Sequence, residues 1–492
     1  MLASSAHSGY ISPIRFARRA PALHRDTMHF DAPPTSLQTS SPAQRWWREL
    51  TRYHWFVLIV AALAWMADCM DQQLFNIARQ SAMQELLRPE PGVAADDGLV
   101  KERGGFATSI FLIGWGTGGL IFGFVGDMIG RARTMLITIL LYSLFTGLSA
   151  LSQSFWQFGL FRFLTGLGVG GEFAVGVSLV AEVMPDRARP FALGLLQALS
   201  ALGNIAAALI AMAMGQLAKQ EWIDSPWRAM FVVGAVPALL IVFVMRRLKE
   251  PEKWTKAASE ASLRDRFTAY YAELFSNPRW TRNAVIGLLL ASSGIIGLWA
   301  IGFFSFDLQQ SVFDEQHVIA RGLDPREEVA QKWFWAGMTS ITFNIGAACG
   351  IYAFSYVTHY LGRRPTFAIS FVLAMLSTAF VFWQFDGVGD IFWMIPMMGF
   401  CLLGLFGGYA IYFPELFPTR LRSSGTSVCY NGARFVAAFG TSALGLLTNR
   451  VYDGYPGTLP FRYAGITMCA VFIVGLLVLP FAPETKGKPL PE

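Results

Sequence analysis

Long apolar runs follow one another along the chain and are separated by short polar segments. Most runs have the length that an α-helix needs to cross about 30 Å of hydrocarbon. The chain is 54% hydrophobic and 15% charged, and so few charges are untypical of a water-soluble protein of 492 residues. We therefore predict an all-α membrane protein with twelve transmembrane helices, at residues 55–78, 106–126, 133–151, 156–184, 191–217, 227–245, 283–306, 333–357, 366–384, 391–413, 424–447 and 462–482.

Three polar motifs at predicted helix ends occur twice, at a nearly constant distance along the chain. GDMIGRAR is matched by HYLGRRP, EVMPDRAR by ELFPTRLR, and EPEK by PETK. Gly130 and Gly362 are 232 positions apart, and Pro185 and Pro418 are 233 positions apart. A constant offset is the signature of an internal duplication. We therefore predict two pseudo-symmetric six-helix bundles.

The same pattern divides the chain into five parts. The two bundles are predicted at residues 51–250 and 282–484, and residues 251–281 are expected to form a cytoplasmic connector. Residues 1–50 are rich in Ser, Ala and Pro, so we expect a disordered cytoplasmic tail. Residues 485–492 are expected to form a second, short tail on the same side.

Charged residues between the predicted helices alternate in sign from loop to loop. Basic clusters such as GRAR, DRAR, GRR and TRLR alternate with acidic stretches such as PGVAADDG, EWIDSP and DGVGD. This positive-inside pattern places both termini in the cytoplasm, and it accounts for the net charge of +6 without a nucleic-acid partner. We expect a multi-pass protein of a bacterial inner membrane that acts as a monomer.

The repeated motifs resemble those of a known family. GFVGDMIGRAR is similar to the G-x-x-x-D-x-x-G-R-[RK] signature of the major facilitator superfamily. The paired E-x-x-P-x-x-x-R motifs and the terminal PETKG are similar to its sugar-porter and organic-ion branches, and the resemblance covers about residues 50–484. It implies a major facilitator fold, in which two bundles enclose a substrate site near the midplane and open alternately to each side.

Acids and arginines at the cytoplasmic helix ends of that family form contacts that break when the transporter opens inward. The resemblance assigns this cytoplasmic gate to Asp127, Arg131, Arg133, Glu182, Arg189, Arg363, Arg364, Glu415 and Arg422. The alternative is that the arginines serve only as topology signals.

Two aspartates interrupt the first predicted helix, within WMADCMDQQLFN. Asp68 and Asp71 are three residues apart and share a helix face near the bilayer centre, where a charge costs about 2.5–3.5 kcal/mol on insertion scales. Because two neighbouring carboxylates repel each other, we expect one of them to hold a proton. At an offset of 232 their counterparts are Ala300 and Phe303. The pair is a candidate for proton coupling, and the alternative is a structural ion pair with a buried arginine.

Arg162, in RFLTGLGVGGE of the fourth predicted helix, is the candidate partner. Sugar/proton symporters pair an Asp of helix 1 with an Arg in a similar R-x-x-x-G-x-G-x-G of helix 4, and the resemblance places Asp71 and Arg162 at these positions. Glu172, which ends the motif, is either a second protonatable group or a packing acid paired with Arg162. The glycines between Arg162 and Glu172 are predicted to let the fourth helix pack tightly against helix 1 or 2.

Polar residues of other helices indicate a substrate site. Asn431 and Arg434 lie three apart on one face of CYNGARF, and a buried Arg can hold a carboxylate through two parallel hydrogen bonds. The alternative for Arg434 is a contact with a lipid phosphate. Five further residues are substrate-binding candidates, although each could equally pack or face lipid: Gln72, Gln197, Asn204, Trp299 and Tyr409.

Together these features predict a secondary active transporter that carries a small organic anion, such as an aromatic acid or a sugar acid, in symport with a proton. D-x-x-D in helix 1 is similar to the D-G-[FY]-D of aromatic-acid and sialic-acid symporters, and helix 7 lacks the Q-Q-x-x-G-x-N of sugar porters. A sugar porter and a drug or metabolite exporter are the alternatives. We expect no enzymatic activity, no metal site and no cofactor, with the substrate, the proton and the lipid bilayer as the partners.

Overall fold

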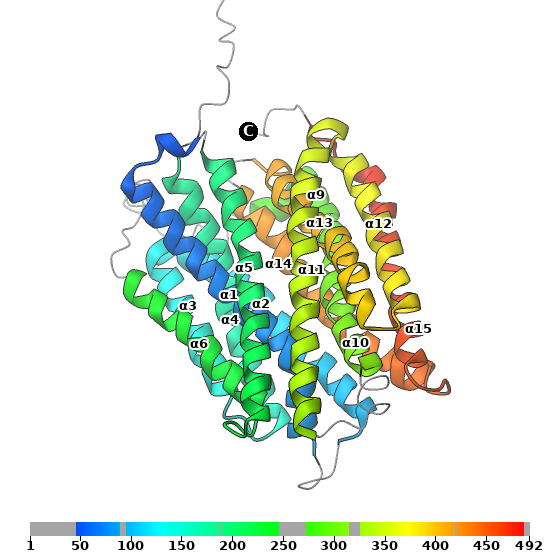
Figure 1. The fold of residues 1–492 in the computed structure, drawn as a ribbon. Helices are drawn as coiled ribbons and strands as arrows, with labels where there is room; N and C mark the ends of the chain where they lie inside the picture. The colour runs from blue at the N-terminus through cyan, green and yellow to red at the C-terminus, as the bar shows by residue number, and fades with distance from the viewer. Residues whose placement is uncertain are drawn as a thin grey trace, which may run out of the picture. The chain divides into compact units, whose positions relative to one another are not determined.

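The computed structural model of the chain describes residues 46–88, 95–185, 188–245, 272–313, 325–418 and 421–486. Every regular element in these residues is a helix, which confirms the predicted all-α fold class. In Figure 1 the long helices run side by side along a common direction.

Six helices form the first bundle: α1 (Arg52–Leu86), α2 (Asp97–Ile129), α3 (Arg131–Ser149), α4 (Phe155–Val183), α5 (Arg189–Lys219) and α6 (Pro226–Met245). α1 begins where the hydroxyl of Thr51 accepts a hydrogen bond from the backbone N–H of His54. It continues eight residues past the predicted end, because the polar stretch that follows the apolar run, ARQSAMQEL, is rich in helix formers.

The second bundle contains interrupted helices. Its elements are α9 (Pro278–Ile296), the π-helical η2 (Gly297–Gly302), α10 (Ser305–Phe313), α11 (Pro325–Leu361), α12 (Arg363–Gln384), η4 (Val388–Phe392), α13 (Met394–Glu415), α14 (Arg422–Leu446), η5 (Leu447–Val451), α15 (Leu459–Met468), α16 (Val471–Val478) and η6 (Leu479–Phe481). α9, η2 and α10 together make the seventh predicted helix, and α15, α16 and η6 make the twelfth.

Two predicted boundaries are shifted in the structure. Trp46–Glu49, at the end of the predicted disordered tail, is the short 3-10 helix η1, and α9 begins four residues before the predicted start of the second bundle. Residues 1–45 of the predicted tail, 246–250 at the end of the predicted first bundle and 251–271 of the predicted connector lie outside the described residues.

Within the described residues, ten helical stretches are long and apolar enough to cross a membrane. α6 and α14 complete the twelve that the sequence predicts. α14 is the more polar of these two, since its first half carries SSGTSVCYNGAR. The chain is therefore a multi-pass membrane protein.

The internal repeat appears in the backbone at two glycines. Gly130 separates α2 from α3 with a φ of 110°, and Gly362 separates α11 from α12 with a φ of 96°. Residues with a side chain rarely adopt such angles. The GR motif is thus repeated because each copy needs a glycine to reverse the chain between two helices.

Glycines also bring α2 and α4 together, as the sequence predicts for the fourth helix. A Cβ on Gly166 would lie 2.8 Å from the backbone nitrogen of Trp115, and one on Gly118 would lie 2.6 Å from the carbonyl carbon of Leu167. The corresponding pair in the second bundle is α11 and α13, where Gly350 packs against the backbone of Phe400. Small residues at these positions let the helix backbones touch.

The two bundles meet mainly along α2 and α14 and along α5 and α11. We call the end at which α1 begins the terminal end, and the end at which α1 stops the distal end (Figure 1). Polar contacts join the bundles from mid-helix to the distal end: Gln73 to Ser340, Ser109 to Ala438 and Thr441, Asn204 to Asn344, Lys219 to Glu327, and Asn449 to Gly98. In this conformation the bundles are closed against each other at the distal end.

Candidate transport site

Asp71 and Arg162, predicted as partners, lie together inside the first bundle. Nη1 of Arg162 is 3.8 Å from Oδ2 of Asp71, and both side chains are almost fully buried. Two hydroxyls of α3 complete the contact. Thr146 donates to Oδ1 of Asp71 at 2.6 Å, and Ser149 accepts from Nε and Nη2 of Arg162 at 3.2 and 2.8 Å. Through these two hydroxyls, α3 fixes the positions of Asp71 and Arg162 relative to each other.

Three aromatic rings surround the guanidinium of Arg162. Its Cζ lies 4.7 Å from the ring centroid of Phe231, 5.6 Å from that of Phe75 and 5.7 Å from that of Phe158. Ring faces attract a cation and exclude water. The three rings thus stabilise the buried guanidinium in addition to its contact with Asp71.

Asp68 lies one turn before Asp71 and has weaker partners. Its Oδ2 accepts a hydrogen bond from Gln72 at 3.1 Å, and its Oδ1 has no hydrogen-bond partner among the described residues. The charges that act on it are those of Glu172 and Asp71, which repel it, and that of Arg434, which attracts it. Oε2 of Glu172 is likewise buried without a described partner. A buried carboxylate costs several kcal/mol when unpaired, and a proton on either group removes that cost.

Arg434 lies at the boundary between the bundles. Its Cζ is 3.9 Å from the ring centroid of Trp115 on α2 and 4.2 Å from that of Tyr430. Nη1 donates to the Tyr430 carbonyl at 2.9 Å and to Oδ1 of Asn431 at 3.1 Å. Nε of Arg434 and the indole N–H of Trp115 find no acceptor among the described residues. Two buried donors are thus available to an anion.

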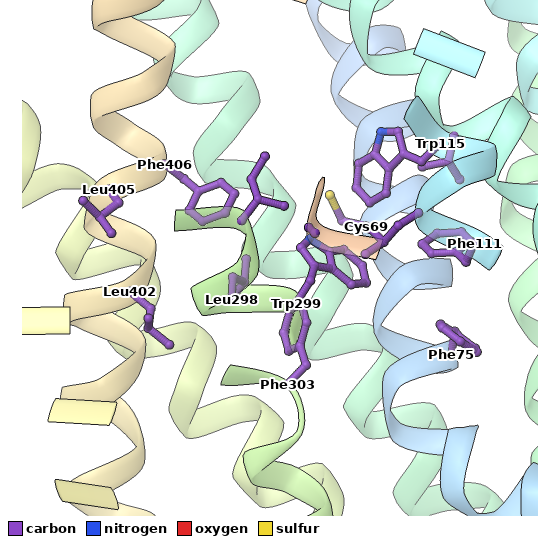
Figure 2. Close-up of a cluster of buried hydrophobic side chains, with 14 of the residues drawn as sticks. Cys69, Phe75, Phe111, Trp115, Leu298, Trp299, Phe303, Leu402, Leu405 and Phe406 are labelled. Carbon is purple, nitrogen blue, oxygen red and sulfur yellow. The ribbon is translucent and has the colours of Figure 1, made fainter. Parts of the chain in front are cut away.

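An aromatic strip, made of Phe111, Trp115, Trp299 and Phe303, joins the two bundles (Figure 2). Its Trp115 packs against Arg434. The rings of Trp115 and Trp299 meet edge to face at 5.4 Å, and Trp299 also contacts Phe111 at 5.8 Å and Phe303 at 5.0 Å. Trp299 is carried by the π-helical η2, a rare geometry that recurs at functional sites. The strip offers flat apolar surfaces next to a cation.

The other predicted substrate residues are spread more widely. Gln72 binds Asp68, and Asn204 donates to Oδ1 of Asn344 in the opposite bundle at 2.6 Å. Gln197 is half-buried on α5. Tyr409 is inside the second bundle, where its hydroxyl donates to the Leu290 carbonyl at 2.7 Å and its ring stacks on Phe413. The structure therefore gives Tyr409 a packing position, away from the contact between the bundles.

The predicted gate residues that the structure describes in the second bundle pair within that bundle. Arg363 donates from Nη2 and Nε to Glu415 at 2.7 and 3.1 Å. Arg364 donates instead to the carbonyls of Leu479 and Pro480. In the first bundle, Arg131 and Arg133 lie in the first turn of α3. The remaining side chains of the predicted gate lie outside the described residues: Asp127, Glu182, Arg189 and Arg422.

Glu484 of the PETKG motif has a role that the sequence did not reveal. Its carboxylate accepts the backbone N–H groups of Arg363 and Arg364 at 3.0 Å, at the start of α12, and those of Thr485 and Lys486. Burial alone raises the pKa of Glu484, but these four donors outweigh it and hold the pKa below the ordinary value. The motif thus ties the end of the chain to the Gly362 turn.

Sequence reasoning missed an ion pair between the bundles. Nη2 of Arg79, on α1, lies 2.7 Å from Oδ2 of Asp307, on α10, and both side chains are buried. The predicted helices ended at residues 78 and 306, so each charge fell one position outside. An acid and an arginine directly after two apolar runs were the available signal.

Two six-helix bundles with buried charges at their meeting surfaces define a membrane transporter. The comparison with family models agrees, because the model described as Major Facilitator Superfamily matches residues 55–323 and the model described as Sugar (and other) transporter matches residues 286–486. The chain belongs to the major facilitator superfamily, and it is a transporter of small molecules rather than an enzyme.

Similar proteins include transporters of organic compounds. The chain is 27% identical over 453 residues to a putative metabolite transport protein of Haemophilus influenzae, covering 90% of this chain and 99% of that one. It is 28% identical over 439 residues to the cis,cis-muconate transport protein of Acinetobacter baylyi, covering 88% and 95%. The crystal structure of a D-xylose–proton symporter superposes with a TM-score of 0.68 at 17% identity, covering 89% of this chain and 100% of the other, which shows a shared fold.

Proposed function

We propose that the protein is a proton-coupled symporter of a small organic anion with a flat, unsaturated or aromatic body. The observation that carries the proposal is Arg434, a buried guanidinium whose Nε has no acceptor among the described residues and which stacks on Trp115. A carboxylate fits these donors, and the aromatic strip fits a planar carbon skeleton. The similarity to a cis,cis-muconate transport protein supports this substrate class.

The proposed coupling runs through the acids of the first bundle. A proton binds Asp71, the contact with Arg162 weakens, and the three rings around Arg162 retain the released guanidinium. Asp68 and Glu172 form a second proton-accepting pair. The charge of Arg434 attracts Asp68 without a direct hydrogen bond, so a proton on Asp68 leaves the Arg434 charge to attract the substrate carboxylate. The loaded bundles then rock about the site and open to the other side.

The positive-inside pattern supports an orientation in a bacterial inner membrane with both termini in the cytoplasm. In that orientation the distal end faces outward, and the structure corresponds to a state that is closed to the outside. The gate residues predicted from the sequence then lie at the cytoplasmic end, where Arg363 and Glu415 form a contact within the second bundle.

A sugar porter is the second candidate, because the Sugar (and other) transporter model matches residues 286–486. A neutral sugar gives the buried donors of Arg434 no counter-charge, and for this reason we favour an anion.

The test is uptake into proteoliposomes that hold the purified full-length protein, driven by an imposed pH gradient. We expect accumulation of cis,cis-muconate or benzoate, and not of D-xylose. Asp71→Asn is expected to abolish gradient-driven accumulation while leaving exchange of substrate across the membrane, because a neutral side chain cannot carry the proton. Full accumulation by Asp71→Asn, or uptake of D-xylose that Arg434→Gln leaves unchanged, contradicts the proposal.

A further inference from the structure

The ion pair between Arg79 and Asp307 lies outside the site described so far and spans the two bundles. Arg79 is 1% exposed, and its guanidinium lies 3.8 Å from the ring centroid of Phe304 and 3.5 Å from the hydroxyl of Thr108. α1 belongs to the first bundle and α10 to the second. The pair therefore exists only while the distal ends are together, and opening that end must separate it.

Arg79 is placed in line with Arg434 along α2. Arg434 packs on Trp115, and Arg79 reaches Thr108, seven residues earlier on the same helix face. At 1.5 Å per residue the two guanidinium groups are about 10 Å apart along the helix axis. Phe111 lies between these two α2 positions and contacts Trp299 of the aromatic strip. A ligand that enters from the distal end meets Arg79 first and Arg434 second.

The surroundings of Asp307 are positively charged. Arg79 faces it from α1, and Lys101 of α2 acts on it electrostatically. From α11, Lys332 lines a small cavity together with Gln309 of α10, and its ammonium binds Glu328 at 2.7 Å. η2 and residues 365–384 of α12, which also pack against α10, contain no charged residue. Such surroundings attract an anion.

An unused amide lies near the pair. Asn76 precedes Arg79 by three residues on α1 and is 2% exposed, and neither its oxygen nor its nitrogen has a hydrogen-bond partner among the described residues. Separating a buried ion pair leaves a charge without compensation, which is strongly unfavourable. A carboxylate from outside the protein has the same hydrogen-bond-accepting oxygens as Asp307 and can replace it on Arg79.

We propose that Arg79 is a second carboxylate-binding site at the distal end, occupied by Asp307 in the closed conformation and by the substrate carboxylate when that end opens. A proton from the distal solution binds Oδ2 of Asp307, the hydrogen bond from Nη2 of Arg79 breaks, and Arg79 forms a new one to the substrate. The site rests on the proposed function, since it takes the substrate to be an organic anion.

The first experiment compares substitutions of Arg79 and Asp307, because only Arg79 is proposed to bind the substrate. Uptake is measured in proteoliposomes for Arg79→Gln and Asp307→Asn at mildly acidic and mildly alkaline pH. Arg79→Gln is expected to raise KM about tenfold or more at both pH values, the effect of losing one hydrogen bond to a charged group. Asp307→Asn, which imitates the protonated acid, is expected to keep uptake and to lower KM at alkaline pH to the value of the wild type in acid. If the ion pair only holds the distal ends of the bundles together, both variants are expected to have equal effects, and that result overturns the proposal.

The second experiment is independent of transport and of the central site. Thermal unfolding of the purified full-length protein is followed with and without benzoate in an Arg434→Gln background. Benzoate is expected to stabilise Arg434→Gln/Asp307→Asn and not the same protein with Arg79→Gln added. No stabilisation of the double variant, or stabilisation that survives the loss of Arg79, overturns the second site. Failure of the proposed function is detected separately, in the uptake experiment, as substrate accumulation that Arg434→Gln leaves unchanged.

A matched control is Asp386→Asn. It removes the negative charge from another Arg–Asp contact, to Arg462 at 3.0 Å, but both residues belong to the second bundle. No change in KM or in stabilisation by benzoate is expected. Thermal unfolding without ligand establishes that each variant is folded. If Arg79→Gln does not fold, Arg79→Lys replaces it, because lysine keeps the charge but lacks the planar fork of the guanidinium. Arg79→Lys is expected to weaken substrate binding, and full retention contradicts the site.

Discussion

Asn431 is held in place by a helix of the opposite bundle. It accepts one hydrogen bond from Arg434, and its side chain lies against Gly119 of α2, where a Cβ would come within 2.5 Å of its Cγ and 2.8 Å of its Oδ1. The geometry of the proposed anion site is therefore set by an absent side chain on α2 as much as by the residues of α14.

Gly119→Ala is expected to push Asn431 aside and to release Nη1 of Arg434 from its side-chain acceptor. Loss of a hydrogen bond to a charged group corresponds to about 1.5–3 kcal/mol, so substrate affinity should fall about tenfold or more, measured as KM for gradient-driven uptake. Gly123→Ala on the same helix is the control, because nothing lies within 4 Å of a Cβ there. Equal affinities of the two variants would show that Gly119 does not position Asn431.

Charged residues inside apolar runs were the most readable part of the sequence. Asp71, Arg162 and Arg434 stand out because a charge in the bilayer is costly. Their uncharged partners do not. Ser149 and Trp115 are common residues of membrane helices, and only the packing of α3 and α14 against α4 and α2 shows what they contact.

At the scale of elements, the twelve helices followed from the apolar runs, but their internal geometry did not. The seventh was predicted as one helix over 283–306, and the structure divides it into α9, η2 and α10. The π-helical turn is a change of backbone register, closed by the hydrogen bond from the N–H of Phe303 to the Leu298 carbonyl at 2.9 Å. A hydropathy pattern carries no information about this backbone register. Hydropathy also missed Arg79 and Asp307, because each lies one position beyond the end of a predicted helix.

The glycines that join α2 to α4 are expected to be sensitive to substitution. A Cβ on Gly118 meets the backbone of Leu167, which cannot move without separating the helices. Gly118→Ala should lower the free energy of unfolding by about 1–3 kcal/mol through overpacking, seen as a lower midpoint of thermal unfolding. Gly147→Ala on α3 is the matched control, since its Cβ would lie at an ordinary 3.6 Å from that of Ala235. A Gly118→Ala midpoint equal to that of the control would mean that α2 and α4 separate without cost.

At the scale of the whole molecule, the end of the chain closes the second bundle at its terminal end. Arg363 binds Glu415, Thr485 donates to the same carboxylate at 2.5 Å, and Glu484 caps α12. One cluster thus joins α12, α13 and the segment after η6. The partners of Glu484 and Thr485 on α12 and α13 lie 70 or more positions away in sequence, which is why these contacts could not be predicted.

The cluster makes stability depend on pH in a direction that the Glu484 pKa fixes. Although burial opposes it, hydrogen bonding from four backbone N–H groups holds the Glu484 pKa below its ordinary value of 4.5. A carboxyl with a lowered folded pKa contributes stability above that ordinary value, and the contribution is lost as pH falls through the folded pKa. Glu484→Gln should therefore unfold at a lower temperature than the wild type at neutral pH, and the two midpoints should converge as pH falls to about 4 and below. Asp453→Asn, in the exposed turn after η5, is the control and should follow the wild type throughout. A Glu484→Gln difference that is constant from neutral to acid pH would show that the side chain acts through its shape and not through its charge.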